Sequence, residues 1–217
     1  MLHFDVILSS LAFVLPGIIV TLEFTILSLV CGLPLGIFLA FCKISPICVL
    51  KKFAEAYTSV FRGTPLLLQL GLIFFATPQL TGYPISAFEA GILAFSLNSA
   101  AYTSEIIRGG IQSLDPGQWE VARVLGIPYR HTLLKIILPQ ATRTILPTLV
   151  NEMINLLKES AIVCTIGEAD LMKRAQMMSM EKFLYFEPYI VAGFYYFIMV
   201  MIISHFGKKL EKKLAYA

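Results

Sequence analysis

Long apolar runs separated by short polar segments dominate the chain. Each run approaches the roughly 20 residues that a helix needs to cross the hydrocarbon layer of a membrane. Five runs are expected to form such helices, at Phe13–Phe41, Leu66–Leu80, Ile85–Ile107, Leu146–Ile166 and Tyr189–Phe206. The runs are too long, and alternate too little, for the strands of a membrane barrel. The pattern therefore predicts an all-α, polytopic membrane helix bundle of about five transmembrane helices.

The five runs differ in clarity. The first is longer than the hydrocarbon layer requires, so its helix is expected to tilt or protrude. Pro16 and Pro34 are expected near its two ends, where a lost backbone hydrogen bond matters least. The second run is short unless the polar stretch "FRGTP" before it adds a first turn. The fourth run is interrupted by three charged residues, Glu152, Lys158 and Glu159.

A polar segment, about Arg108–Pro139, separates the third and fourth runs, and its core at about residues 115–139 has helix signals. Asp115 is placed to cap a helix, with Pro116 in its first position and Gln118 where a capping box has Glu or Gln. Gly126 is placed to end that helix in the left-handed conformation. The segment therefore predicts a short helix followed by a sharp turn.

A second short helix is expected to begin at Pro128 and to stop or bend at Pro139. The first helix has an apolar face formed by Trp119, Ala122, Val124 and Leu125. Such a unit is able to present a knob to a groove on a partner protein. The alternative is a surface helix that covers only its own bundle, and the physical pattern alone leaves both readings open.

Composition excludes a water-soluble globule. Of the 217 residues, 57% are apolar and 14% are charged, against roughly 25% charged in soluble domains. We therefore interpret residues 1–217 as a single transmembrane domain. The net charge of +3, without a basic tract rich in aromatics, does not favour nucleic acid. The four cysteines form no CxxC pair and the three histidines are scattered, so no metal site is expected.

The N-terminal residues lack the basic region and cleavage site of a signal peptide, so the first run is expected to be retained. The loop before the second run, the third loop and the C-terminal tail together hold 13 of the 17 basic residues. The positive-inside rule then places the N-terminus outside and the C-terminus in the cytoplasm. The chain has no G-x-x-x-x-G-K-[ST] motif, so it is not expected to bind ATP through such a loop.

Within the 115–139 segment, Glu120-Val121-Ala122, Gly126 and Ile137-Leu138-Pro139 resemble the "EAA…G…I-LP" loop of importer permeases in the ABC superfamily. Val121 departs from the pattern, because the family usually has Ala at that place. Three further blocks resemble the polar amino-acid branch of the family (His/Arg/Gln/Glu-type uptake) in chain order: Phe61–Leu70, Ser96–Glu120 and Ile145–Gly167. The resemblance covers the chain from about Gly17 to its tail.

This resemblance implies a permease subunit of an ATP-driven amino-acid importer in the bacterial cytoplasmic (inner) membrane. It implies that the loop docks on an ABC ATPase subunit through Trp119, Glu120, Ala122 and Gly126. The implied partners are two ATPase copies, a second permease that is identical or similar, membrane lipid, and an extracytoplasmic amino-acid-binding protein. No cofactor is expected on this chain, since ATP is used by the partner subunit.

Ionisable residues inside spans are costly and suggest function. An amino acid brings an ammonium, which needs acceptors, and a carboxylate, which needs donors. Glu105 and Glu159 are candidate acceptors, while Asn98 and Ser160 are candidate donors. In the resembled branch the third and fourth spans line the translocation path, which favours these four residues. Glu159 stands where Asp is usual, and all four residues alternatively serve only to pair neighbouring helices.

Other classes of function remain. An ion-gradient-driven carrier or a passive solute channel is the main alternative, although a carrier is usually longer and contains internal repeats. A membrane-embedded enzyme is disfavoured because no catalytic constellation of His, Cys or carboxylates is evident. Copurification with an ATPase distinguishes the importer from the other two.

Overall fold

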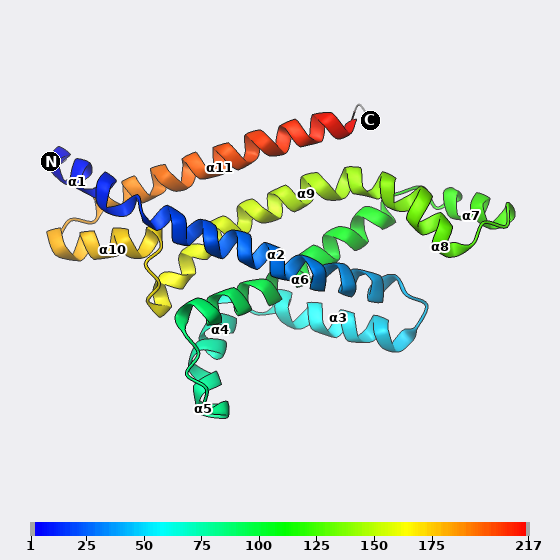
Figure 1. The fold of residues 1–217 in the computed structure, drawn as a ribbon, viewed down its shortest axis with the longest axis horizontal. Helices are drawn as coiled ribbons and strands as arrows, with labels where there is room; N and C mark the ends of the chain where they lie inside the picture. The colour runs from blue at the N-terminus through cyan, green and yellow to red at the C-terminus, as the bar shows by residue number, and fades with distance from the viewer. Residues whose placement is uncertain (1–2, 216–217) are drawn as a thin grey trace.

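The computed structural model describes residues 3–215, with side chains to residue 213, and within them the chain is helical and contains no strand (Figure 1). Four long helices form the body: α2 (Gly17–Ile44), α6 (Ala87–Gln112), α9 (Leu138–Glu159) and α11 (Phe186–Ala215). The α2 helix packs along α6, and α9 packs against both α6 and α11. The predicted all-α membrane-type fold is confirmed.

Short helices lie at the two ends of this body (Figure 1). One end, here called the α7–α8 end, carries α7 (Gly117–Val124) and α8 (Tyr129–His131). The opposite end, the α1–α10 end, carries α1 (Phe4–Val14) and α10 (Leu171–Lys182), which pack on each other and on α11. The bundle therefore places the polar segment between the third and fourth runs at the opposite end from the N-terminus.

Helix length and composition identify the spans. The α2 and α11 helices are each long and apolar enough to cross a membrane, and a third span is formed if a bent helix pair is taken as one. With 26 and 22 residues, α6 and α9 reach about 39 and 33 Å at 1.5 Å per residue. They are less apolar because they carry the polar residues of the candidate path.

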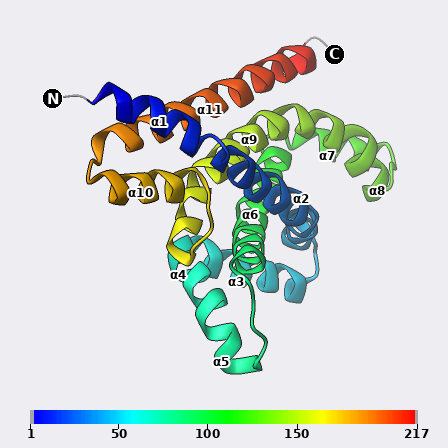
Figure 2. The ribbon, with the colours of Figure 1, turned by 60° about the vertical axis from the view of Figure 1, so that its left-hand side comes forward.

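The bent pair consists of α3 (Cys48–Gly63) and an arm made of α4 (Leu66–Gly71), the π-helical η1 (Leu72–Ala76) and α5 (Thr77–Thr81). The two parts meet at 99°, and Figure 2 shows the arm extending away from the body. Proline lacks an N–H and disfavours helical geometry in the preceding residue, so Thr64 is extended and the helix breaks before Pro65. The sequence predicted the arm but not α3.

The first and fourth runs differ in detail from their prediction. The first is divided, because the chain turns at Leu15-Pro16 between α1 and α2. Pro34 lies inside α2 and not near its end, so that expectation was wrong. Before the fourth run, α8 continues through the π-helical η2 (Thr132–Ile137) into α9, so Pro139 does not stop the helix. A 3₁₀ segment, η3 (Ser160–Ile166), follows α9.

The contact of α2 with α6 depends on two glycines. A Cβ added at Gly36 would lie 2.7 Å from the Cβ of Thr103, and one at Gly32 would lie 2.8 Å from the backbone oxygen of Ser96. Small-xxx-small spacing allows such close approach between helices in membranes. The sequence spacing Gly32-x-x-x-Gly36 therefore marks a real packing face.

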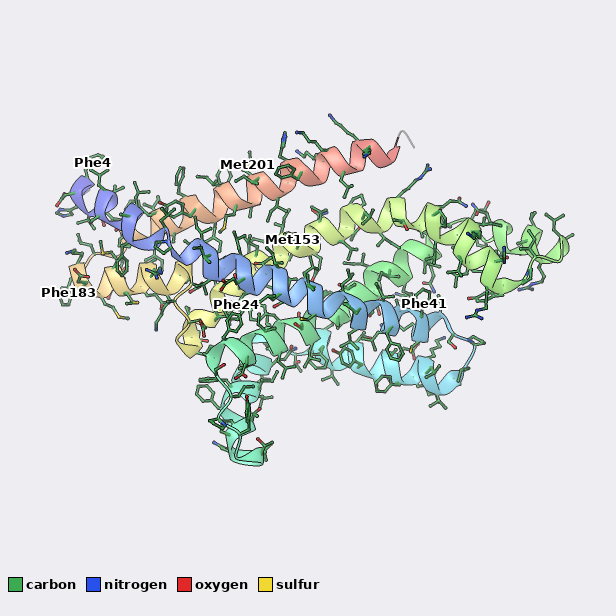
Figure 3. The ribbon with its side chains drawn as sticks, viewed as in Figure 1. Phe4, Phe24, Phe41, Met153, Phe183 and Met201 are labelled. Carbon is green, nitrogen blue, oxygen red and sulfur yellow. The ribbon has the colours of Figure 1, made fainter. Side chains whose placement is uncertain are left out.

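Apolar side chains cover the outside of the molecule as well as its interior (Figure 3). Phe24 is fully buried, whereas Phe4 is 70% and Met201 55% exposed. Apolar side chains that would be unfavourable in water are stable against lipid, which agrees with a bundle embedded in a bilayer.

Candidate functional site

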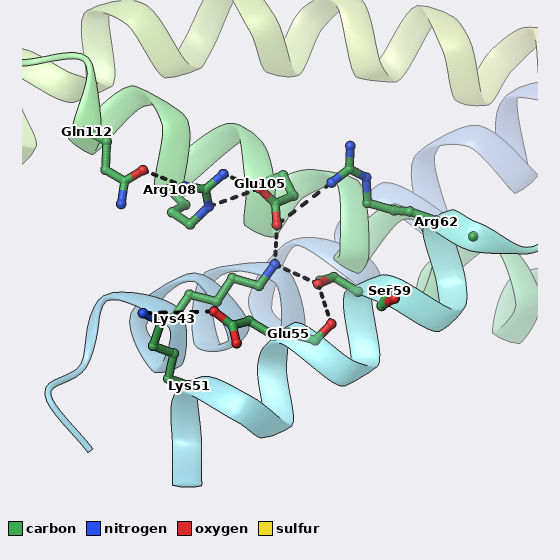
Figure 4. Close-up of a pocket in the computed structure, with 10 residues that line it drawn as sticks. Lys43, Lys51, Glu55, Ser59, Arg62, Glu105, Arg108 and Gln112 are labelled. Atoms are coloured by element: carbon green, nitrogen blue, oxygen red, sulfur yellow. Dashed lines mark hydrogen bonds and ion pairs between the residues drawn. The ribbon is translucent and has the colours of Figure 1, made fainter. Parts of the chain in front are cut away.

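Glu105 on α6 stands at the centre of a network of cations (Figure 4). Its Oε1 is bound by the ammonium of Lys43 from the last turn of α2. Its Oε2 accepts hydrogen bonds of 2.9 and 2.6 Å from the guanidinium of Arg108. Arg62 on α3 approaches Oε1 to 3.8 Å. The Glu105 carboxylate on α6 therefore links α6 to α2 through Lys43 and to α3 through Arg62. Its single negative charge faces three positive charges.

Lys43 is the most buried member of this network. Its side chain is 3% exposed, and its ammonium also donates a hydrogen bond of 2.7 Å to Thr58 Oγ1 on α3. A buried charge is costly unless it is paired and hydrogen-bonded. The sequence placed Lys43 among the basic residues of a loop, so its internal role was missed.

A cleft of about 520 Å³ opens beside the network, between α2, α3 and α6. Its rim includes the Lys51–Glu55 pair on α3, which is 4.0 Å apart and 54% exposed at both side chains. Such an exposed pair contributes little to stability. The remaining lining is polar or charged and includes Ser59, Arg62, Arg108 and Gln112.

Two buried amides stabilise the break between α3 and α4. Gln69 Nε2 donates to the backbone oxygens of Phe61 at 2.8 Å and Thr64 at 3.1 Å, carbonyls that the end of α3 leaves without helical partners. Asn98 Nδ2 on α6 donates to the same Phe61 oxygen at 3.2 Å and to Gln69 Oε1 at 3.1 Å. Gln69 is the one polar residue in the apolar stretch "LLLQL", and this isolated amide could have indicated an internal hydrogen-bonding role that the sequence analysis did not predict.

The structure places the four predicted path residues in different settings. Asn98 and Glu105 are seven residues apart, so they share one face of α6. Glu159 is exposed at the end of α9, whereas Ser160 is fully buried and donates to Leu157 O at 2.8 Å. Among the described residues, no hydrogen bond or ion pair joins any two of the four. Glu105 already binds cations through both oxygens, and both contacts of Asn98 use its amide nitrogen.

Glu152 and Arg62 are charged residues that the prediction left out of the path. Glu152 on α9 is 7% exposed and has no cation within 4.0 Å among residues 3–213. Arg62 lies in the last turn of α3, at the bend, with its guanidinium 5.3 Å from the ring centre of Tyr102. A carboxylate inside an apolar run was the available signal for Glu152.

The predicted capping of the loop helix was wrong in detail. The α7 helix begins at Gly117 with Pro116 as its N-cap, and Asp115 Oδ1 accepts from Gly117 N at 2.8 Å. The Gln118 side chain does not reach back to Asp115. It exchanges two hydrogen bonds of 2.9 and 2.8 Å with Gln140 on α9, and this exchange ties α7 to the end of a long helix.

The end of α7 matches the prediction. Gly126 has a φ of +70°, and the N–H groups of Ile127 and Gly126 donate to the oxygens of Ala122 and Arg123 at 2.9 and 3.1 Å. This pattern is a Schellman motif, in which glycine avoids the steric cost of the left-handed conformation. The predicted left-handed glycine at this position is confirmed.

The predicted apolar face of α7 is divided between two environments. Ala122 is buried, and Trp119 stacks on Tyr129 with ring centres 5.2 Å apart. Val124 and Leu125 are 87% and 69% exposed. Glu120 and Val121 are also exposed. The loop is therefore attached to the bundle on its inner side, while apolar side chains and the charged side chains of Glu120 and Arg123 are exposed on its outer side.

Within the described part of the chain, no group of three or more His, Cys, Asp or Glu residues is arranged to hold a metal ion. The four cysteines are free thiols. The polar residues instead gather at one bend, one cleft and one end of a membrane bundle. A helical bundle with a broken helix, charged residues inside its long helices and an exposed loop helix is the architecture expected of a membrane permease.

Comparison with known proteins supports this class. The model of the family described as "Binding-protein-dependent transport system inner membrane component" matches residues 32–216. The chain is 50% identical over 205 residues to a protein of Rickettsia typhi named putative glutamine transport system permease protein GlnP, with 94% of each chain covered. It is 47% identical over 213 residues to the arginine transport system permease protein ArtQ of Bacillus subtilis, with 98% and 97% covered.

A solved structure also matches closely. The crystal structure of an amino acid ABC transporter with histidines has a TM-score of 0.92 and 43% identity, covering 98% of this chain and 99% of that one. The protein therefore belongs to the family of binding-protein-dependent transport system inner membrane components, and it is a permease subunit of an ABC transport system.

Proposed function

We propose that this permease imports amino acids, driven by ATP that a separate ATPase subunit hydrolyses. Relatives of nearly equal length carry names that refer to glutamine and arginine transport. The observation that carries the coupling part of the proposal is the rigid, exposed surface of α7. The chain itself is not the enzyme of the system in this proposal, and it binds no cofactor.

The α7 surface is suited to transmit motion. Its Schellman motif, the Trp119–Tyr129 stack and the Gln118–Gln140 exchange fix it to the helix that continues into α9. A force applied to α7 by an ATPase would therefore reach the spans without being absorbed by a flexible loop. Glu120 is exposed on this surface, as is Arg123, and Glu120 is proposed to contact the ATPase directly.

The substrate path is proposed to run between α6, α9 and the bend. Glu159 is the predicted acceptor that stands exposed, free to meet an ammonium. Asn98 keeps its side-chain oxygen available, since both of its hydrogen bonds use the amide nitrogen. Glu105 contributes by holding the cationic wall of the cleft together, and Ser160 contributes by its position at the end of α9. Charged groups in a span are expected to face such a path and not lipid.

The assembly follows from this arrangement. Two ATPase copies would bind at the α7–α8 end, and a second permease, identical or similar, would cover the polar faces of α6 and α9. An extracytoplasmic binding protein would deliver the amino acid at the α1–α10 end. The N-terminus would then lie outside and the C-terminus in the cytoplasm of a bacterial inner membrane, as the distribution of basic residues favours.

The test is reconstitution of the purified complex in liposomes with ATP and Mg²⁺ inside. With the cognate binding protein outside, radiolabelled arginine, glutamine or histidine should accumulate only when ATP is present. The variant Glu120→Lys should abolish uptake while the chain remains in the membrane. The matched control is Glu211→Lys, an equal charge change at an exposed residue of the tail of α11.

Two outcomes would contradict the proposal. Normal uptake by Glu120→Lys would remove the coupling role of α7. Passage of solute through the chain alone, without ATP or a partner, would favour the alternative of a passive channel or an ion-driven carrier. Copurification of the detergent-solubilised chain with an ATPase distinguishes the importer from these alternatives before any transport is measured.

A further inference from the structure

The α11 helix is longer than a membrane crossing requires. Its residues Phe186–Lys213 number 28 and reach about 42 Å at 1.5 Å per residue, whereas the hydrocarbon layer is about 30 Å thick. The stretch between Glu187 and Lys208 contains no Asp, Glu, Lys or Arg, and its length matches the roughly 20 residues that cross this layer. Glu187 accepts a hydrogen bond of 3.1 Å from the backbone N–H of His3 at the α1–α10 end. The excess length of α11 therefore falls on its C-terminal turns.

Four lysines occupy these turns. Lys208, Lys209, Lys212 and Lys213 are exposed, and no acidic group lies within 4.0 Å of their ammonium groups among the described side chains, residues 3–213. Their spacing of one, four and five residues places them within an arc of about 140° on the helix. These four residues, here called the lysine face, concentrate positive charge on one side of α11.

The lysine face is turned away from the bundle. Gly207 marks the side of α11 that packs on α9, because an added Cβ there would lie 2.6 Å from the Cγ1 of Val150. Successive residues of a helix differ by about 100°, so the four lysines lie between about 100° and 240° around the helix from Gly207. This range is centred close to the side opposite α9.

The same side of α11 faces lipid within the span. Met201 and Ile202 precede Lys208 and Lys209 by two turns of helix, and they are 55% and 52% exposed. Apolar side chains exposed on a spanning helix are stable against lipid chains. Figures 1 and 2 both show the C-terminal part of α11 apart from α7 and α8. The lysine face therefore continues a lipid-facing surface toward the headgroups, away from the loop proposed to bind the ATPase.

We propose that the lysine face binds the headgroups of anionic phospholipids, with its ammonium groups paired to phosphate oxygens. A lysine has a long apolar stem, so it lies along the acyl chains while its charge reaches the phosphate level. The negative potential of an anionic membrane surface attracts basic clusters of this kind beside a span. The position over lipid favours this partner over an acidic protein surface. The inference goes beyond the proposed function and does not depend on which solute is carried.

Lipid binding at the lysine face fixes the second end of α11. The first end is attached to α1 through Glu187 and through Tyr195, whose hydroxyl donates to the backbone oxygen of Leu11 at 2.9 Å. A helix longer than the hydrocarbon layer adapts by tilting. Ion pairs between the lysine face and phosphates therefore select the tilt of α11 that keeps all four ammonium groups at the headgroup level.

The test uses the intact complex in bilayers of phosphatidylcholine with a trace of phosphatidylglycerol or phosphatidylcholine that carries a photoactivatable headgroup. Met201 is the last methionine of the chain, so cyanogen bromide cleavage after illumination releases residues 202–217, with the whole lysine face, as one fragment. Mass spectrometry measures the label on this fragment. The phosphatidylglycerol probe should label it about fivefold more than the phosphatidylcholine probe. NaCl at about 1 M should remove most of this preference, because the Debye length is then about 3 Å.

Variants locate the preference on the lysine face. A chain in which all four lysines are changed to Gln should be labelled equally by both probes, whereas the four corresponding changes to Arg should keep the preference. Lys208→Gln with Lys209→Gln should lose part of it. The matched control is Lys51→Gln with Lys52→Gln, an adjacent exposed pair near the start of α3, which should leave the labelling of residues 202–217 unchanged.

Copurification of the ATPase shows whether each variant is assembled, and the salt series and the double variant decide the question if the fourfold Gln variant is not. Equal labelling of wild type by the two probes would overturn the inference. A preference that survives the loss of all four lysines would overturn it as well. Loss of the ATPase from the fourfold Gln variant, with the lipid preference unchanged, would identify the lysine face as a protein contact instead.

Discussion

The ammonium of Lys43 on α2 is bound to the carboxylate of Glu105 on α6, a residue 62 positions further along the chain. This ion pair closes the α7–α8 side of the α2–α6 contact, and the two arginines attach to the same carboxylate. Helix association in membranes lacks a strong hydrophobic drive, so close packing and internal polar bonds decide which faces meet.

Substitution of Glu105 should destabilise the fold more than substitution of its partner Lys43. Glu105→Gln leaves the buried ammonium of Lys43 without an anionic partner and should cost about 3 kcal/mol, as expected for a broken buried pair. Lys43→Met should cost less, because Glu105 keeps Arg108. The thermal unfolding midpoint in detergent measures both, with Lys51→Met as the control at an exposed pair. An equal loss in all three variants would contradict this account.

Gly36 should tolerate no side chain. Gly36→Ala places a Cβ 2.7 Å from the Cβ of Thr103, so overpacking should destabilise the chain by about 1–3 kcal/mol. Gly109→Ala is the matched control, since a Cβ there meets nothing within 4 Å and should stabilise α6 by up to about 1 kcal/mol. Melting curves of both variants in the same detergent make the comparison. A Gly36→Ala protein as stable as wild type would show that α2 shifts freely on α6.

Loss of the Gln69 side-chain amide should loosen the bend. Gln69→Leu removes the side-chain donor to the Thr64 oxygen and one of the two side-chain donors to the Phe61 oxygen, and an unsatisfied buried carbonyl costs about 1–3 kcal/mol. Asn98→Leu should cost less, because Gln69 still satisfies Phe61. The two losses should not be additive, since the Asn98–Gln69 hydrogen bond is lost in both single variants and the Phe61 oxygen loses its last side-chain donor only in the double variant. A double-mutant cycle on thermal stability measures this coupling, and strictly additive losses would exclude it.

Gly126→Ala should weaken coupling without unfolding the bundle. Nothing lies within 4 Å of an added Cβ, so the cost is the left-handed backbone alone, about 1–2 kcal/mol. That cost falls on the end of α7, and ATP-dependent uptake should decrease while the membrane level is kept. Gly126→Asn should be milder, because asparagine tolerates this conformation. Equal uptake by the Ala variant and wild type would show that the turn is not needed.

Asp170 should make stability depend on pH near the α1–α10 end. It lies in the loop before α10 and is fully buried, and burial raises its pKa from 3.8 to about 6. The folded state thus holds a proton that the unfolded state releases, so the Asp170 contribution falls as pH rises from about 4 to 6 and is constant above. Asp170→Asn keeps an oxygen for the N–H of Lys173, 2.8 Å away, and should remove this slope.

The measurement for Asp170 is the difference in unfolding midpoint between variant and wild type at pH 5 and pH 7.5. The variant should gain more at pH 7.5, where wild type carries a buried charge. Glu181→Gln changes an exposed acid, 62% accessible at its side chain, and should show no such difference. A variant that gains equally at both pH values would contradict the shifted pKa.

The apolar runs determined the class of fold, the approximate position of the spans and the left-handed turn at Gly126. These features are local: the length of an apolar run and the backbone freedom of one glycine do not depend on distant residues. The tertiary structure alone decided that Lys43, far along the chain from Glu105, is internal, and that Arg62 approaches the same carboxylate from the end of α3, beside a bend of 99°. Which charges pair depends on how helices cross, and crossing is decided by side-chain contacts between residues that the sequence keeps apart.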